Sequence, residues 1–193
     1  PQGAHKSVDV LPTVDPEVLR SLVQGVVGIE ANHAGRLNEL ARAGLPVVAM
    51  DFHQMDASFD SVYADHEEAG FQATAHLLAL GHRRIAYVGE RCNPRSSDPT
   101  WQQRMTGYLR AMAWAGGETP RPLILAGPRD TSKLYRDLPE FQRRHRPTAY
   151  VMASGGWAPE LLEILKAAGV HCPRDISLTC ADAGCVKIGG MTS

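Results

Sequence analysis

The sequence lacks the features that mark several large classes of protein. None of its 193 residues belongs to an apolar run approaching the roughly 20 residues that span a bilayer, and no signal peptide opens the chain. Its 20 Lys and Arg side chains are matched by 21 Asp and Glu, which gives a net charge of −1. A chain with this balance carries no electrostatic footprint for DNA. We therefore expect a cytoplasmic globular protein with no membrane partner, whose DNA contacts, if it makes any, come from another segment.

Cysteine is scarce, and its spacing indicates neither a metal site nor a disulfide framework. Cys92, Cys172, Cys180 and Cys185 form no CxxC pair, and no neighbouring His spacing suggests zinc. The motifs of common catalytic sites are also missing, including GxSxG, GxxxxGK[ST], HExxH and GxGxxG. The sequence therefore predicts reduced thiols, no metal, no cofactor and no enzymatic activity. A glycosidase-like pair of carboxylates stays open as a minor alternative.

The most informative stretch of the chain is 62–88, VYADHEEAGFQATAHLLALGHRRIAYV. Acidic residues at Asp65, Glu67 and Glu68 open a helix that Gly81 ends, and IAYV then supplies a buried strand. Along this helix the apolar residues recur at helical spacing, at Ala69, Ala73, Leu77 and Leu80. A helix followed by a buried strand is the repeating unit of a parallel α/β sheet.

The same alternation runs through the rest of the chain. Strands are expected at 7–13, 26–31, 45–50, 85–88, 123–126, 147–154 and 176–182. Helices are expected to begin at Asp15-Pro16, with Asp15 as the cap, and to cover the region of Leu37 to Ala41, 65–80, 101–116, 134–144 and 159–168. Residues 52–61 and 90–100 are expected to be loops. Since no Asn-Gly or Asp-Gly hairpin turn separates the strands, the sequence predicts a doubly wound α/β fold with parallel sheets.

Polar residues follow several of these strands directly. Asp51, Glu90, Ser154 and Asp182 come at the carboxyl ends of their strands, where doubly wound sheets bind ligands. Carboxylates accept paired hydrogen bonds from vicinal hydroxyls, so this group of side chains suits a polyhydroxylated or aminated small molecule.

Seven phrases in order resemble the effector-binding domain of the LacI/GalR family of bacterial transcription regulators. They are LPVVAMD, SVYADHEEAG, HLLALGHRRIAYVG, QQRMTGYLRAM, RPTAYVMAS, LKAAGVHCPRDISL and the corner at Asp182. The resemblance implies a two-lobe, periplasmic-binding-protein-like fold, with 1–64 a partial N-terminal lobe, 65–190 the C-terminal lobe and 191–193 the start of a return crossover. It also implies that the chain is a fragment, without the helix-turn-helix and the hinge helix of the family.

The resemblance also carries site residues over to this chain. Arg104, in the RxxG phrase that ends at Gly107, is expected to bind effector oxygens with its fork of donors, although it could be a surface arginine. Asp182 corresponds to the first Asp of a family pair, and Ala183 replaces the second. Asp51 is expected to face the ligand from the other lobe. Both aspartates could instead be turn or cap residues.

Two further candidates lie in the phrase ASGGW. Ser154 stands where the family usually has Asn, so the hydrogen bonding around the ligand should differ from the family pattern. Trp157 is expected to stack on a sugar ring, as Trp101 could, although either tryptophan could be part of the core.

The resemblance therefore implies the effector-sensing domain of a transcriptional regulator, a repressor, that binds a sugar or sugar derivative between two lobes. Its partners would be operator DNA, bound through the missing segment, and a second copy in a homodimer that uses residues 159–168 and 184–188. The alternative from the same fold is a periplasmic sugar-binding protein of a transporter.

Overall fold

The computed structural model describes residues 14–29, 34–54, 56–90, 100–116, 121–127 and 131–182. The chain divides into two compact units, unit 1 at Pro1–Ala64 and unit 2 at Asp65–Ser193. The expected strand at 7–13, most of the loop at 90–100, the segment at 184–188 and the crossover at 191–193 lie outside the described residues.

Unit 1 contains a three-stranded parallel sheet, sheet A, with strand order β1-β2-β3. Its elements in chain order are α1 (Pro16–Leu22), β1 (Val26–Ile29), α2 (Ala34–Arg42), β2 (Val47–Met50) and β3 (Asp60–Val62). The prediction that Asp15 caps the first helix is confirmed, because its carboxylate accepts a hydrogen bond from the Glu17 amide at 2.8 Å. Strand β3 was expected to be loop. It has only three residues, none of them buried, so the sequence gives no strand signal.

The core of unit 1 lies on one face of sheet A. The buried residues there include Leu37 and Leu40 of α2, Val47 and Ala49 of β2, and Phe52. Because neighbouring residues of a strand point to opposite faces, the other face carries Val27, Ile29, Val48 and Met50, all of which are exposed.

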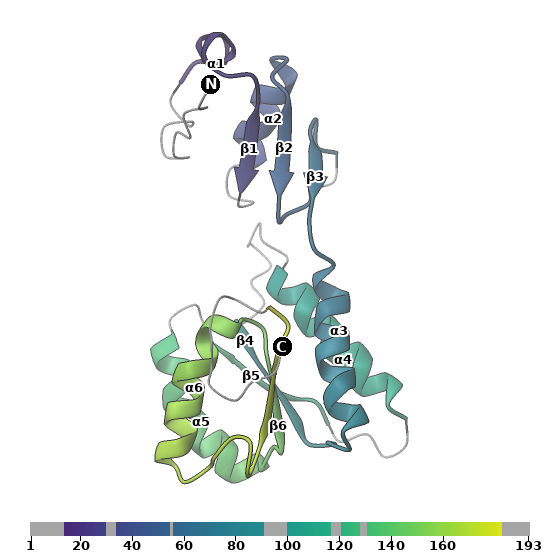
Figure 1. Ribbon diagram of the computed structural model, residues 1–193, viewed down its shortest axis with the longest axis vertical. Helices are drawn as coiled ribbons and strands as arrows, with labels where there is room; N and C mark the ends of the chain where they lie inside the picture. Colours follow the sequence, from purple (N-terminus) through teal and green to yellow (C-terminus); the bar gives the residue numbers. More distant parts are fainter. Residues whose placement is uncertain are drawn as a thin grey trace. The chain divides into compact units, whose positions relative to one another are not determined.

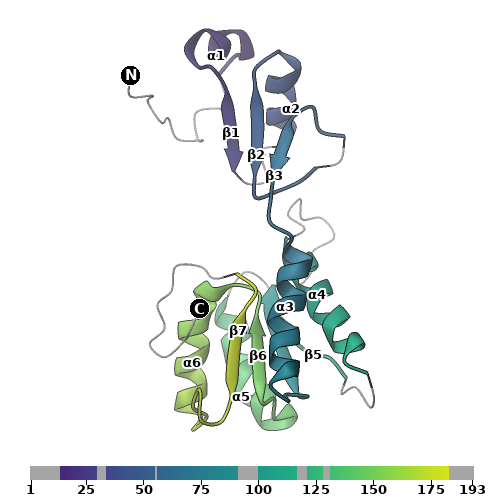
Figure 2. The same cartoon turned by 45° about the vertical axis from the view of Figure 1, so that its right-hand side comes forward.

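Unit 2 is a doubly wound layer structure around a four-stranded parallel sheet, sheet B, with strand order β5-β4-β6-β7. Its elements are α3 (His66–Ala79), β4 (Ile85–Glu90), α4 (Thr100–Trp114), β5 (Leu123–Gly127), α5 (Thr131–His145), β6 (Ala149–Met152), the 3₁₀ turn η3 (Gly155–Trp157), α6 (Ala158–Ala167) and β7 (Ser177–Cys180). Helices α3 and α4 cover one face of sheet B, and α5 and α6 cover the other (Figure 1, Figure 2). The predicted doubly wound α/β fold is confirmed.

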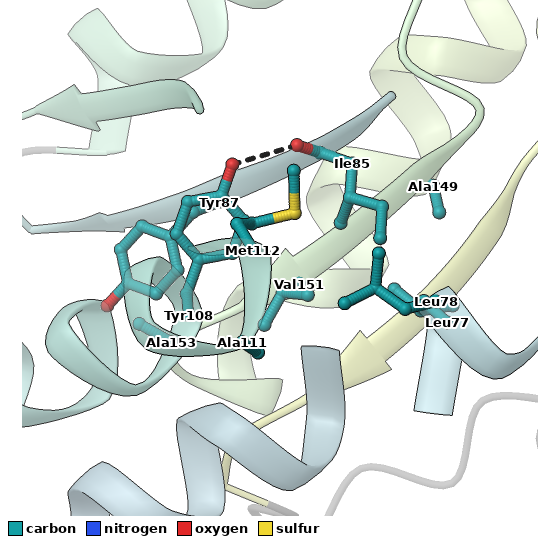
Figure 3. Packing of buried hydrophobic residues seen from close by; sticks show 10 residues of the cluster. All are labelled: Leu77, Leu78, Ile85, Tyr87, Tyr108, Ala111, Met112, Ala149, Val151 and Ala153. Carbon is teal, nitrogen blue, oxygen red and sulfur yellow. Dashed lines mark hydrogen bonds between the residues drawn. The ribbon is translucent and has the colours of Figure 1, made fainter. Parts of the chain in front are cut away.

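The two central strands of sheet B contribute to two cores in alternation. Ile85 and Tyr87 of β4 pack with α3 and α4, whereas Ala86 and Val88 pack with α5 and α6. Figure 3 shows the first of these cores, in which the Tyr108 hydroxyl donates to the Ile85 carbonyl at 2.9 Å. Burial raises the pKa of Tyr108 to about 12. Strands buried on both faces explain the continuous apolar runs of the sequence.

The apolar series predicted for α3 is only partly buried. Leu80 is 62% exposed and lies at the C-cap, after the last helical residue. The buried side of the helix instead carries two small residues, Gly70 and Thr74, followed by Leu77 and Leu78. Gly70 is needed there because α4 crosses α3 at short range, so that a Cβ at this position would collide with the backbone of α4.

Candidate functional site

Arg104 is a buried charged side chain at the carboxyl edge of sheet B. It lies in the first turns of α4, and only 6% of its surface is exposed. Its Nη1 donates to the Ala153 carbonyl at 2.7 Å, just beyond the end of β6, and lies 3.4 Å from Oδ2 of Asp182. Its buried Nε has no hydrogen-bond partner among the described residues. Because an unsatisfied buried donor costs roughly 1–3 kcal/mol, stability alone does not account for an arginine at this position.

Two helical glycines bring Arg104 to this place. A Cβ on Gly70 would lie 2.1 Å from the Arg104 carbonyl oxygen, and a Cβ on Gly107 would lie 2.0 Å from the Glu67 carbonyl oxygen. Only glycine allows α3 and α4 to approach so closely. The RxxG spacing therefore has a structural reason, since Gly107 forms the crossing and Arg104 lies one turn earlier, at its edge.

The close crossing also brings His66 to Arg104, a contact that the sequence analysis missed. His66 is the first residue of α3 and is only 6% exposed. Its Nδ1 lies 3.2 Å from Nη2 of Arg104. A guanidinium can only donate, so Nδ1 accepts, and the proton of the neutral ring is on Nε2. The glycines at 70 and 107 were the available signal, because helical glycines in two neighbouring helices indicate a close crossing.

Asp182 follows β7 and closes the site on the other side of Arg104. Its backbone carbonyl accepts from the Gly155 amide at 3.0 Å, which ties it to the turn after β6. Its side chain is 41% exposed, and the 3.4 Å contact to Arg104 is longer than a typical charge-assisted hydrogen bond. Burial raises the pKa of the nearby Cys180 thiol to about 11, and the charge of Asp182 adds to the shift. Because its side chain is 41% exposed, the Asp182 carboxylate can accept hydrogen bonds from a molecule outside the protein.

Ser154 and Trp157 lie in the turn that joins β6 to α6. Ser154 is half-buried and caps η3, where its hydroxyl accepts a long hydrogen bond of 3.4 Å from the Gly156 amide. Trp157 stacks on Trp101 of α4, with 4.9 Å between ring centroids and 22° between ring planes. One face of each tryptophan ring therefore packs on the other ring.

The structure thus brings four of the predicted residues to one edge of sheet B: Arg104, Asp182, Ser154 and Trp157. Asp51 belongs to unit 1, where it follows β2 and is exposed. Its backbone has a φ of 66°, a left-handed conformation that Asp adopts more readily than most residues. Its amide donates to the Val62 carbonyl at 2.8 Å, which closes the loop between β2 and β3. Glu90 ends β4, and its side chain lies outside the part that the structure describes.

The chemistry of this edge is that of recognition. A fixed guanidinium beside an exposed carboxylate offers donors and acceptors a few ångströms apart, an arrangement that matches neighbouring hydroxyl groups. Within the residues that the structure describes, no three His, Cys, Asp or Glu side chains gather in a way that could hold a metal ion. None of the helices that the structure describes combines the length and apolar character needed to cross a membrane.

Comparison with known proteins assigns the family. Residues 74–187, more than half of the chain, match the periplasmic binding protein-like domain. The chain belongs to this family. The match includes Arg104, Ser154, Trp157 and Asp182, and its first residue is Thr74 of α3.

Curated relatives of this periplasmic binding protein-like domain are transcriptional repressors. The arabinose metabolism transcriptional repressor of Geobacillus stearothermophilus is 26% identical over 174 residues, covering 84% of this chain and 46% of that protein. The HTH-type transcriptional repressor PurR of Photobacterium profundum is 29% identical over 144 residues, covering 74% and 42%. The chain therefore spans less than half the length of these relatives.

Solved structures agree with this assignment. A PurR family transcriptional regulator from Vibrio parahaemolyticus superposes with a TM-score of 0.69 at 25% identity, covering 85% of this chain and 61% of that one. A LacI family regulator from Enterococcus faecium, solved with bound ribose, gives a TM-score of 0.67 at 24% identity, with coverages of 89% and 61%. The resemblance to LacI/GalR effector domains is confirmed. The relatives are repressors rather than enzymes, and a periplasmic transport protein is not favoured.

Proposed function

We propose that the chain is the effector-sensing domain of a LacI/GalR-type transcriptional regulator, and that unit 2 binds a small carbohydrate at the carboxyl edge of sheet B. The observation that carries the proposal is Arg104. It is buried and charged, it lies beside the exposed carboxylate of Asp182, and it is held by hydrogen bonds that leave part of its guanidinium unsatisfied by the described residues. The repressor relatives support the regulatory role, and one of them takes its name from arabinose metabolism.

In this proposal Arg104 and Asp182 share neighbouring hydroxyls of the ligand. The guanidinium donates to one hydroxyl oxygen, and the carboxylate accepts from the next hydroxyl. Ser154 adds a donor at the same edge, and Trp157 packs on the apolar face of the sugar ring. Asp51 of unit 1 is the further ligand-binding residue in this proposal, by the resemblance to LacI/GalR effector domains.

A thermal-shift screen tests the proposal. The chain is heated with pentoses, hexoses, disaccharides, sugar phosphates, nucleosides and purines, one at a time. A ligand at about 100 times its dissociation constant stabilises the folded state by roughly 2.7 kcal/mol, a clear rise in melting temperature. We expect a sugar to give this rise. If only a purine raises the melting temperature, the ligand is a nucleobase and not a carbohydrate. If no compound of the panel raises it, the proposed site is contradicted.

Matched variants locate the binding. Arg104→Met and Asp182→Asn should each remove the sugar-dependent rise, because each deletes one half of the donor–acceptor pair. Arg136→Ala, on the exposed surface of α5, should leave it unchanged. Asp51→Ala tests the contribution of unit 1. If Arg104→Met folds and still responds to the sugar, the ligand binds elsewhere.

Regulation would act on operator DNA through a helix-turn-helix segment, in a cytoplasmic homodimer that uses α6. Because the net charge of this chain is −1, we expect it to show no DNA affinity by itself in a gel-shift assay. Sedimentation velocity measures the dimer directly. A monomer at high protein concentration would contradict a dimer contact on α6.

A further inference from the structure

The contact between His66 and Arg104 goes beyond ligand recognition itself, because it concerns what holds the arginine in place. His66 is as deeply buried as Arg104, with 6% of its surface exposed. It begins α3 directly after the N-cap Asp65, whose carboxylate accepts from the Glu68 amide at 2.9 Å. The first turn of α3 is therefore fixed at its cap, and the glycine crossing fixes it against α4.

Two neutral acceptors hold the two terminal nitrogens of the guanidinium. Nη2 lies 3.2 Å from Nδ1 of His66 on α3, and Nη1 donates at 2.7 Å to the Ala153 carbonyl after β6. Because the two acceptors come from different elements, they define the plane of the guanidinium rather than only its position. A buried carboxylate at either place would also orient the arginine, but it would neutralise the charge.

The charged partner is held differently from the two neutral ones. Asp182 lies at 3.4 Å from the guanidinium, and its side chain is 41% exposed. Orientation therefore comes from short or buried contacts with neutral groups, whereas the ionic contact is long and open to solvent. An arrangement of this kind keeps the positive charge available to a ligand. Because the side chain is already oriented, ligand binding does not have to supply the free energy of ordering it.

We propose that His66 is a positioning residue for Arg104: its neutral ring, protonated on Nε2, accepts from Nη2 and holds the guanidinium in the orientation that binds the ligand. This inference rests on the proposed function for the role of Arg104. The hydrogen bond itself can be tested without any ligand.

The ligand-independent test is ¹⁵N NMR of the histidine side chains of the whole chain at pH 8. We expect His66 to show an unprotonated Nδ1 and a protonated Nε2, and its Nδ1 resonance to shift in Arg104→Met. A His66 ring protonated on Nδ1, or a spectrum that Arg104→Met leaves unchanged, would overturn the proposal. His76, exposed on the same helix, provides the reference signal.

The ligand test uses a pair of variants that separate accepting a hydrogen bond from filling space. His66→Asn places an amide oxygen where Nδ1 was, and His66→Leu fills similar volume without an acceptor. With L-arabinose, or the panel sugar that stabilises the chain most, His66→Leu should weaken binding about tenfold, the size expected for losing one such contact. His66→Asn should restore affinity to within about threefold, and His76→Leu should have no effect.

The outcomes separate the two proposals. If no sugar raises the melting temperature, but the Nδ1 resonance of His66 shifts in Arg104→Met as expected, the proposed function is wrong and the positioning of the guanidinium stands. If the sugar binds and a folded His66→Leu binds it equally well, the positioning role is wrong and the proposed function stands. Equal loss in His66→Asn and His66→Leu would also overturn it, because the acceptor would then not be what matters.

Discussion

Strands β2 and β6 have similar sequences, VVAM and AYVM, and differ in what covers them. All four residues of β6 are buried, whereas β2 alternates between buried and exposed residues. Sheet B has helices on both faces, while the described residues cover only one face of sheet A. A continuous apolar run therefore identifies a strand of a parallel sheet, but only the second layer decides whether both faces become core.

The comparison of the two sheets also applies to the candidate site residues at their carboxyl ends. The carboxyl edge of sheet B is defined by groups from α3, α4, the end of β6 and the end of β7, so its geometry depends on a completed layer structure. In unit 1, Asp51 lies at the end of a strand that the described residues cover on one face, and its amide donates to the Val62 carbonyl of β3.

The largest expected effect on stability comes from introducing one carboxylate into β6, with the same change in β2 as its comparison. Val151→Asp buries a carboxylate in the core between sheet B and α3/α4, which should cost about 3–5 kcal/mol. Val48→Asp, on the exposed face of sheet A, should cost less than about 1 kcal/mol. Urea unfolding measures both.

All three tryptophans lie in unit 2, so their fluorescence reports that unit, and far-UV circular dichroism reports the whole chain. If Val151→Asp does not fold, Val151→Thr replaces it, with an expected cost of about 1–3 kcal/mol. Equal losses at Val48 and Val151 would show that the bare face of sheet A is covered in solution.

The next effect concerns helical glycines. Gly107→Ala places a Cβ 2.0 Å from the Glu67 carbonyl oxygen, so α3 and α4 must separate, at a cost of about 1–3 kcal/mol. Gly35→Ala in α2 meets no atom within 4 Å and should be neutral or stabilising by up to about 1 kcal/mol. The urea midpoint of Gly107→Ala should fall and that of Gly35→Ala should stay unchanged or rise, and a neutral Gly107→Ala would contradict the close crossing.

The smallest effect is a loss of stability of unit 2 at high pH. The pKa of Tyr108 is raised from 10.0 to about 12 by burial, so the unfolded state releases this proton first as the pH rises. The stability from this group is complete below pH 10 and is lost as the pH rises towards 12, with a loss of about 1.4 kcal/mol at pH 11.

Tyr108→Phe provides the control for this titration. It should be less stable at neutral pH by about 1 kcal/mol, because it loses the hydrogen bond to Ile85, and it should lose less stability between pH 8 and pH 11 than the parent. Tryptophan fluorescence during urea unfolding measures both. Identical slopes with pH would assign the alkaline loss to other groups such as Tyr150, whose pKa burial also raises.

Most elements of the fold could be predicted because their signals are local. Asp15 and Asp65 begin helices through hydrogen bonds to amides two or three residues away, and Gly81 ends α3 with a positive φ of 91°. Strand β3 could not be predicted, because its three residues carry no apolar pattern and, within the part of the chain that the structure describes, pair with β2 alone. Leu80 was misassigned because periodicity continues past the point at which the helix ends.

The candidate site divides in the same way. Asp182 could be proposed because it follows a strand, and Arg104 because its RxxG phrase resembles that of the LacI/GalR family. The stacking of Trp101 on Trp157 and the contact of His66 with Arg104 could not, since they join residues 56 and 38 positions apart in the chain.

The sequence by itself determined the alternation of helices and strands, their caps and the chemistry available at the strand ends, because these depend on local hydrogen bonds and on the spacing of apolar residues. The tertiary structure decided which apolar faces are buried, how closely α3 approaches α4 and which groups surround Arg104. Those properties depend on packing between layers, where a missing Cβ at Gly70 and Gly107 allows a contact that no single segment encodes.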